Sequence, residues 1–373
     1  MPTTQRLFTD FTSSTRADWI AKIQKDLKGR PISDLDWHLT NDLTIHPFAH
    51  SEDLNETYPP IRQAGNKWDI GATVEIKSQD FKKANQQALT ALSAGVNALW
   101  FCFDKYPTPE DLRILIKDIQ LDCITSHFFK SRELTTPLPF LKNLRLLAQE
   151  TGIVPSLLKG SVHIDQGTNL SNDHESIVEL VSWTAENLPL FKTITIRPNE
   201  IDNPVESLSL ALSQVNHSFK KLIKLNIKSS VLASQAQFML PVGTNYFVEI
   251  AKIRALHLLW GNLLHAYKLP PIPATIHAVT TIDVQSDDQN KNKIKATTQA
   301  MSAIIGGVTS LNLAPSDTRG EESSDFNKRI AINVQHILQM ESYFDKVADP
   351  AAGSYYIETL TNQIAEAAWS NTK

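Results

Sequence analysis

From residue 69 onward the chain alternates between short, almost continuously hydrophobic runs and longer amphipathic stretches. The short runs are rich in β-branched and aromatic residues and are bounded by turn residues, which is typical of buried β-strands. Strands are predicted over residues 69–76, 97–103, 119–125, 158–164, 191–196, 235–240, 273–279 and 308–313. Because helical stretches separate them, we expect parallel strands joined by helical crossovers.

The amphipathic stretches predict the helices of this alternation. They cover residues 80–94, 138–149, 205–215, 245–266, 292–304, 325–340 and 362–370. Eight strand–helix units over about 260 residues is the length expected of a closed barrel. The predicted fold class is therefore α/β, a (β/α)8 TIM barrel. An open doubly wound sheet is the alternative, but it would require a ligand signal such as a phosphate-binding glycine fingerprint, and the sequence has none.

The first 58 residues follow a different pattern, and we predict a boundary between residues 1–58 and a barrel over 59–373. Ser13 or Ser14 is expected to cap a helix over residues 15–27. Its apolar face consists of Trp19, Ile20, Ile23 and Leu27. The next thirty or so residues are too apolar for disorder and too irregular for a domain. They predict a helical arm that leaves the barrel and packs on another surface.

The composition does not change the predicted fold, but it argues against several kinds of partner and location. The 373 residues are 42% hydrophobic and 20% charged, with a formal net charge of -4. Since nucleic acids and anionic membranes bind clustered basic surfaces, neither is a predicted partner. The polar N-terminus lacks the apolar core of a signal peptide, and no run has the length of a membrane span. Cys102 and Cys123 are predicted to be buried strand thiols of a reducing compartment, and the location is predicted to be cytoplasmic.

Candidate chemistry is expected at the C-terminal ends of the strands, where barrels bind ligands. The polar residues near these ends are His163, Asp165, Arg197, Glu200, Gln235, Gln237, Asn245, His277, Asp283, Asp317 and Arg319. They indicate either an acid–base site or solvated loop ends and helix caps. The second interpretation is favoured because no pair has a spacing that a reaction requires. His277, in an apolar strand, is the best single candidate, and no Cys–His spacing predicts a metal site.

The segment from Asp349 is a turn punctuated by glycine and proline that is expected to enter a β-like run. It closely resembles the D-P-x-x-G-S-Y-Y-x-E-x-L-T signature of the methylmalonyl-CoA mutase family. The matching residues are Asp349, Pro350, Gly353, Ser354, Tyr355, Tyr356 and Glu358. A preceding helix is similar to the family's R-N-x-Q-x-x-L-Q-E-E-S segment, through Asn333, Gln335, Gln339 and Glu341.

Three further segments resemble the same family. Residues 247–255, followed by Leu259 and Trp260, are similar to its F-x-E-I-A-K-x-R-A-x-x-x-L-W helix. Residues 94–101 are similar to its second-strand region, and residues 19–29 to the start of its small subunits. The resemblance therefore covers nearly the whole chain, and it implies the barrel fold.

The positions that the resemblance associates with catalysis differ from the family pattern. Asn199 and Glu200 replace the Tyr-His pair of S-G-Y-H-M-Q-E-A-G-A, and His163 replaces the Gln of G-T-I-Q-N-D. Gln235 and Gln237 stand where the CoA-contacting R-L-S-F-F segment has Arg and Ser.

Two further family segments are also altered. Residues 318–323 replace the E-A-L-G-L-P loop that meets the cofactor nucleoside. In the T-H-x-Q-T segment His277 is kept, while Val279 replaces the Gln.

The family's cobalamin-binding domain has no counterpart in the sequence. Its D-x-H-x-x-G loop, whose His ligates cobalt, has its nearest match in residues 36–41, which lack the Gly and a preceding strand. The resemblance thus implies a small, non-catalytic subunit in a heterodimer whose large subunit holds adenosylcobalamin. No catalytic, cofactor-binding or metal residue is expected in this chain. Remnants of a substrate site are expected at His163, Asp165, Gln235, Gln237, Asn245 and His277.

Two alternatives remain open. A stand-alone barrel without mutase activity would bind an acyl-CoA, at least weakly, although the loss of Arg at Gln235 argues against contacts to the phosphate tail. An active mutase with its cobalamin domain on a separate polypeptide would need the missing Tyr-His pair.

Overall fold

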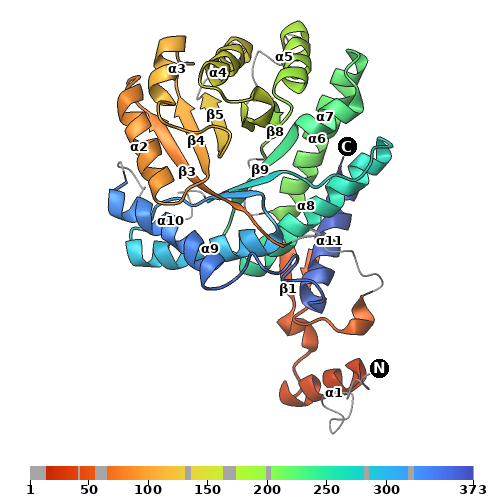
Figure 1. Cartoon of the computed structure of the whole chain (residues 1–373). Coiled ribbons are helices and arrows are strands. Elements are labelled where there is room, and N and C mark those ends of the chain that lie inside the picture. The colour runs from red at the N-terminus through yellow and green to blue at the C-terminus, as the bar shows by residue number, and fades with distance from the viewer. Residues whose placement is uncertain are drawn as a thin grey trace, which may run out of the picture.

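The computed structural model describes residues 14–40, 43–54, 65–130, 136–162, 174–198, 203–280, 285–317 and 323–372. Parallel strands form a ring at the centre of the molecule (Figure 1). They are β3 (Asp69–Ile76), β4 (Ala98–Phe103), β5 (Thr125–Lys130), β6 (Lys159–Val162), β7 (Phe191–Lys192), β8 (Ile194–Ile196), β9 (Ala236–Val242), β10 (Ile276–Thr280) and β11 (Ser310–Asn312).

The ring closes through a strand that changes partner at Thr193. The strand order is β7-β6-β5-β4-β3-β11-β10-β9-β8, and every neighbouring pair is parallel. β7 pairs with β6 and β8 pairs with β9, while only Thr193 separates β7 from β8. These two short strands therefore occupy one position of an eight-position barrel, which confirms the predicted fold class.

Helices surround the strands on the outside (Figure 1). They are α2 (Phe81–Ser93), α3 (Pro109–Leu115), α4 (Leu138–Glu150), α5 (His174–Asn187), α6 (Pro204–Lys224), α7 (Ser229–Gln235), α8 (Tyr246–Ala266), α9 (Gln289–Gly306), α10 (Asp325–Met340) and α11 (Tyr355–Asn371). Between strands and helices lies one large hydrophobic core, which includes Phe101, Phe128 and Phe238.

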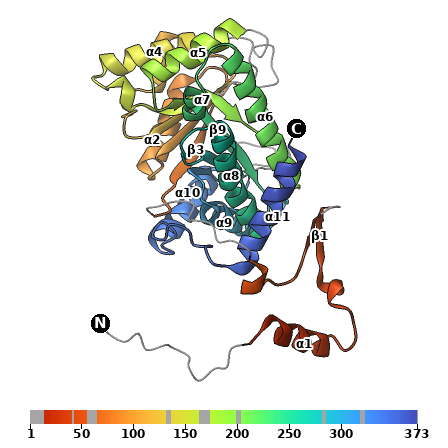
Figure 2. The ribbon, with the colours of Figure 1, turned by 90° about the vertical axis from the view of Figure 1, so that its right-hand side faces the viewer.

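The N-terminal region consists of a helix and a hairpin that differ in their contact with the barrel. α1 (Arg16–Asp26) has no buried residue and lies away from the barrel (Figure 2). The antiparallel hairpin of β1 (Trp37–Thr40) and β2 (Leu43–Ile45), by contrast, joins the core through the buried Ile45. The predicted helix is confirmed, but Thr15 rather than Ser14 is its N-cap, in a capping box with Asp18, and Ser13 lies outside the described residues.

Two predicted strands are wrong. Residues 121–124 form turns and bends before β5, and the alternating buried side chains of Ile119 and Leu121 imitate a strand there. Cys123 is accordingly exposed rather than buried. The segment after Ser354 is not β-like, because the helix α11 begins at Tyr355. Its buried residues follow a helical period, which outweighs the strand preference of the two tyrosines. They are Ile357, Glu358, Leu360, Thr361, Ile364, Ala365 and Ala368.

Candidate functional site

A polar layer crosses the interior of the barrel. His277 of β10 bonds through Nδ1 to Ser310 Oγ (2.6 Å) and through Nε2 to Gln237 Oε1 (3.1 Å). The amide nitrogen of Gln237 donates to Thr195 Oγ1 at 2.8 Å. Because Gln237 Oε1 only accepts, Nε2 of His277 carries the proton and Nδ1 accepts from the Ser310 hydroxyl. This chain of bonds joins β11, β10, β9 and β8.

A second histidine meets this layer from the opposite wall. His127 of β5 bonds through Nδ1 to Ser161 Oγ at 2.7 Å. β5 and β10 are four strand positions apart in either direction around the ring, so they face each other across the axis. The two imidazole rings nevertheless lie only 4.5 Å apart between centroids. Trp100 packs on both rings, at 4.9 Å from His127 and 5.8 Å from His277. At this level side chains fill the barrel axis.

Burial fixes the charge state of both histidines. It lowers the pKa of His127 well below its ordinary value, and the nearby His277 lowers it further. Burial, followed by the positive charge of Lys192, lowers the pKa of His277 to about 3. Both imidazoles are therefore neutral at pH 7, and each is bonded to neighbouring side chains. His277 is bonded through both ring nitrogens, whereas Nε2 of His127 and Nε1 of Trp100 are buried without a hydrogen-bond partner in the described part of the chain.

The structure brings together only part of the predicted substrate-site remnants. Gln237 and His277 are bonded to each other, and Gln235 is buried nearby, where its Oε1 accepts from the Thr193 hydroxyl at 3.0 Å. Asn245 is exposed at the start of α8, where its side chain caps no backbone group. His163 and Asp165 lie outside the described residues.

Sequence reasoning missed His127 and Trp100. Both point into the barrel, and Trp100 belongs to a strand that was predicted correctly. The alternation of Thr125, His127 and Phe129 on one face could have indicated His127, but the strand was placed several residues too early.

Two of the family-signature residues, Asp349 and Glu358, form a buried ion-pair cluster with Arg254, hereafter the Arg254 cluster. The guanidinium of Arg254, from α8, pairs with Asp349 and, at 2.8 Å, with Glu358. The Gly353 N–H donates to the same Glu358 oxygen at 3.2 Å, and its φ of +80° is a conformation that glycine adopts without strain. Asp349 and Glu358 thus join the start of α11 to α8.

The remaining signature residues have several environments. Gln335 is buried in α10, whereas Asn333 and Glu341 are exposed and Gln339 is half-buried. Pro350, Ser354 and Tyr355 are exposed, while Tyr356 packs its ring against Phe247 at 5.7 Å. None of them lies in the polar layer of the barrel.

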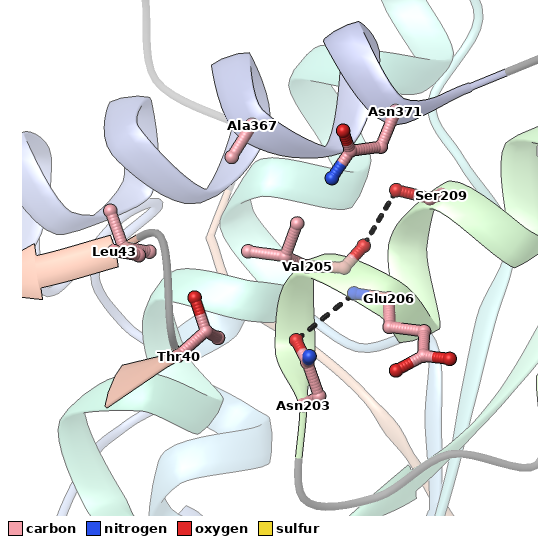
Figure 3. A pocket seen from close by; sticks show the side chains of 8 residues that line it. All are labelled: Thr40, Leu43, Asn203, Val205, Glu206, Ser209, Ala367 and Asn371. Carbon is pink, nitrogen blue, oxygen red and sulfur yellow. Dashed lines mark hydrogen bonds between the residues drawn. The ribbon is translucent and has the colours of Figure 1, made fainter. Parts of the chain in front are cut away.

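A cavity of about 330 Å³ lies outside the barrel, between the N-terminal hairpin, α6 and α11 (Figure 3). Its lining residues are Thr40, Leu43, Asn203, Val205, Glu206, Ser209, Ala367 and Asn371. Asn203 accepts the Glu206 N–H at 3.1 Å as a helix cap, and the Ser209 hydroxyl donates to the carbonyls of Val205 and Ala368. Asn203 therefore caps α6, and Ser209 connects α6 to α11.

The segment around His38 is the part of the sequence most similar to a cobalamin-binding loop, but its structure does not fit cobalamin. His38 lies in β1 of the hairpin and bonds through Nδ1 to Thr44 Oγ1 at 2.9 Å, while Asp36 pairs with His46. A strand–loop–helix that would present a histidine to cobalt is not formed there. Within the described ranges, no group of three or more His, Cys, Asp or Glu side chains could hold a metal ion.

The structure is that of an α/β-barrel protein. Side chains fill the axis of its barrel, and residues of its sequence signature connect two of its helices. A family model described as Methylmalonyl-CoA mutase matches residues 106–373. The chain belongs to the methylmalonyl-CoA mutase family, in agreement with the resemblance found in its sequence.

Curated relatives extend this similarity over most of the chain. It is 32% identical to a methylmalonyl-CoA mutase small subunit of Porphyromonas gingivalis, over 98% of this chain and 63% of the relative. It is 27% identical to a Rhizobium meliloti methylmalonyl-CoA mutase, over 96% and 57%, and 26% identical to the human mitochondrial enzyme, over 94% and 54%. The chain thus spans little more than half to three fifths of these relatives' lengths.

Solved structures add nothing to this assignment. The dihydropteroate synthase of Xanthomonas albilineans aligns with a TM-score of 0.38 at 10% identity, over 74% of this chain and 94% of its own, which is too low for any inference. Among the described helices, none is both long and apolar enough to cross a membrane.

Proposed function

We propose that the chain is the small, non-catalytic subunit of an adenosylcobalamin-dependent methylmalonyl-CoA mutase and supports a catalytic large subunit. The observation that favours this role most is the state of His277, the one histidine kept from the family's substrate site. Its side chain is 3% exposed, both ring nitrogens are bonded within the barrel, and burial lowers its pKa to about 3. This burial and this low pKa argue against contact with a substrate and against proton exchange near pH 7.

The motifs that the chain retains also favour a supporting role. The Arg254 cluster is made of residues that match the family's motifs. It joins α8 to α11, so its role is to stabilise the fold. By contrast, Asn199 and Glu200 stand where the resemblance places the catalytic Tyr-His pair. Adenosylcobalamin supplies a radical for the isomerisation, and a protein must hold the cofactor and the substrate face to face. We assign that task to the large subunit.

The N-terminal arm, residues 1–58, is proposed to bind the large subunit. Trp19 and Trp37 are 40% and 41% exposed, and Trp19 packs on Phe48 of the same arm at 4.2 Å between ring centroids, so both tryptophans keep apolar area that a partner could cover. Withdrawing one large apolar side chain from water contributes roughly 1.5–3 kcal/mol, so a few of them would anchor an obligate interface. Because α1 has no buried residue of its own, its apolar face is available for such a contact.

Co-expression with the cognate large subunit tests the role of the arm. We expect the full chain to co-purify with the large subunit, and deletion of residues 1–50 to reduce the yield of complex at least tenfold. A barrel variant with Ile294→Ser, which alters an exposed apolar side chain far from the arm in sequence, is the control and should leave the yield unchanged. Unchanged yield and large-subunit activity after truncation would place the interface on the barrel instead.

The alternative, a stand-alone acyl-CoA-binding barrel, has no observation in its favour. The contact between His127 and His277 fills the barrel axis, and the Gln235 side chain, at the position of the family's Arg, is buried and bonded to Thr193. Titration of the chain with an acyl-CoA, followed by calorimetry, distinguishes the two. Binding in the micromolar range would favour the alternative over the supporting role.

A further inference from the structure

The C-terminal helix α11 lies between the barrel and the N-terminal hairpin (Figure 2). Toward the barrel it packs on α8 and α6, and the Ser209 hydroxyl of α6 donates to the Ala368 carbonyl at 3.1 Å. On its other side it contacts β2 and the short 3-10 helix η2 (Ser51–Asp53). Segments from the two ends of the chain are therefore stacked on each other.

The hairpin contacts α11 through β2. Ile45 is buried, and Leu39 and Leu43 are partly buried against the core. Near α6 and the last turns of α11, the hairpin borders the cavity of about 330 Å³, which Ala367 and Asn371 of α11 also line (Figure 3). Among the described elements, α11 is the main neighbour of the hairpin outside the N-terminal region.

The start of α11 is in turn held by the Arg254 cluster. Asp349 precedes the helix, and Glu358 lies in its first turn, so Arg254 of α8 pairs with both sides of the turn that begins α11. All three side chains are less than a tenth exposed. Removing one partner of a buried ion pair leaves the others charged and unpaired, which is far more costly than losing a surface pair.

We propose that the Arg254 cluster is a positioning device for the N-terminal arm: it fixes α11 to the barrel, and the hairpin follows α11. The cluster thereby couples the family signature to the surface that presents α1, although the two are distant in sequence. This inference rests on the proposed function in one respect: the large subunit is taken to be the partner that the arm binds. The coupling itself is a property of the isolated chain.

Hydrogen exchange of the full chain, read by mass spectrometry, tests the coupling directly. In Arg254→Met, Asp349 and Glu358 remain buried without a cation, and α11 should open more often. We expect exchange to accelerate roughly 100-fold or more over residues 355–371. Residues 37–53 should accelerate in parallel, while β3, β4 and β9 keep the protection of the parent chain.

Lys252→Met is the matched control. Lys252 lies on the same helix and is fully buried, but it pairs with Glu249 at 2.7 Å within α8 and donates to the Pro241 carbonyl. Its removal leaves an unpaired buried charge without touching the contact to α11. We expect it to leave the exchange of α11 and the hairpin within a few-fold of the parent. Arg254→Lys, which retains a cation, should restore part of the lost protection.

Three results would overturn the inference. One is unchanged exchange of α11 in a folded Arg254→Met. Another is fast exchange of α11 while residues 37–53 stay protected, which would mean that the hairpin is placed independently. If Arg254→Met fails to fold, Glu358→Gln is the second variant, because it weakens one ion pair only. Equal acceleration of exchange in all segments of that variant would show that the cluster stabilises the whole fold and does not position the arm. Because no partner is present, none of these results bears on the proposed mutase role.

Discussion

We expect the buried histidine pair to make the barrel sensitive to mild acid. His127 and His277 are neutral in the folded chain because burial lowers the pKa of each, that of His277 to about 3. In the unfolded chain both regain an ordinary pKa of about 6.5. Below that value the unfolded state binds more protons than the folded state, so acidification favours unfolding. The stability that the two neutral histidines provide is complete above pH 6.5 and is lost progressively as the pH falls.

The size of the effect follows from the unfolded-state pKa alone. Between pH 7 and pH 5.5, protonation of one unfolded histidine lowers the free energy of unfolding by about 1.3 kcal/mol, and of two by about 2.5 kcal/mol. Few carboxylates titrate in this interval, because their ordinary pKa values lie near 4. Domains are stable by only about 5–15 kcal/mol, so the loss is readily measured.

Urea unfolding followed by tryptophan fluorescence at the two pH values is the assay. His277→Gln should reduce the pH-dependent loss by about half, since one histidine remains. His217→Gln is the matched control, because His217 is exposed on α6, and it should leave the loss unchanged. A parent chain that loses less than about 0.5 kcal/mol between pH 7 and pH 5.5 would refute the neutral, buried pair.

Two further predictions concern single positions. Gly160→Ala should cost at least about 3 kcal/mol in thermal or urea unfolding, because the added Cβ would lie 1.8 Å from the Ser126 carbonyl oxygen. Gly152→Ala is the control, as its Cβ meets nothing within 4 Å, and it should cost only about 1 kcal/mol of backbone strain. Iodoacetamide at pH 8 should label the exposed Cys123 well before Cys102, since burial and then Glu75 raise the pKa of Cys102 to about 11. Equal labelling in mass spectra would contradict that environment.

Local periodicity was sufficient for most of the barrel. The strand predicted over residues 69–76 coincides with β3, and the helix over 245–266 differs from α8 by one residue. Helices such as α3 and α5 were missed, and residues 119–125 were taken for a strand. The last error has a physical cause, since a turn that buries alternate side chains has the same pattern as a strand.

The candidate site was less predictable because it depends on closure of the ring. His127 and His277 meet only because strands four positions apart face each other across the axis, and no local pattern contains that information. The same holds for Arg254, whose partners Asp349 and Glu358 lie 95 and 104 residues away in the sequence. The motifs that identified the family were visible in the sequence, but their structural role required the folded chain.

The central claim is that this chain supports a mutase without catalysing the reaction. The most direct measurement is the formation of succinyl-CoA from methylmalonyl-CoA in the presence of adenosylcobalamin. It is made with the purified chain alone, with the cognate large subunit alone and with both together. We expect no turnover by the chain alone and the highest stable activity when both are present. Succinyl-CoA formation by the chain alone would contradict the non-catalytic role.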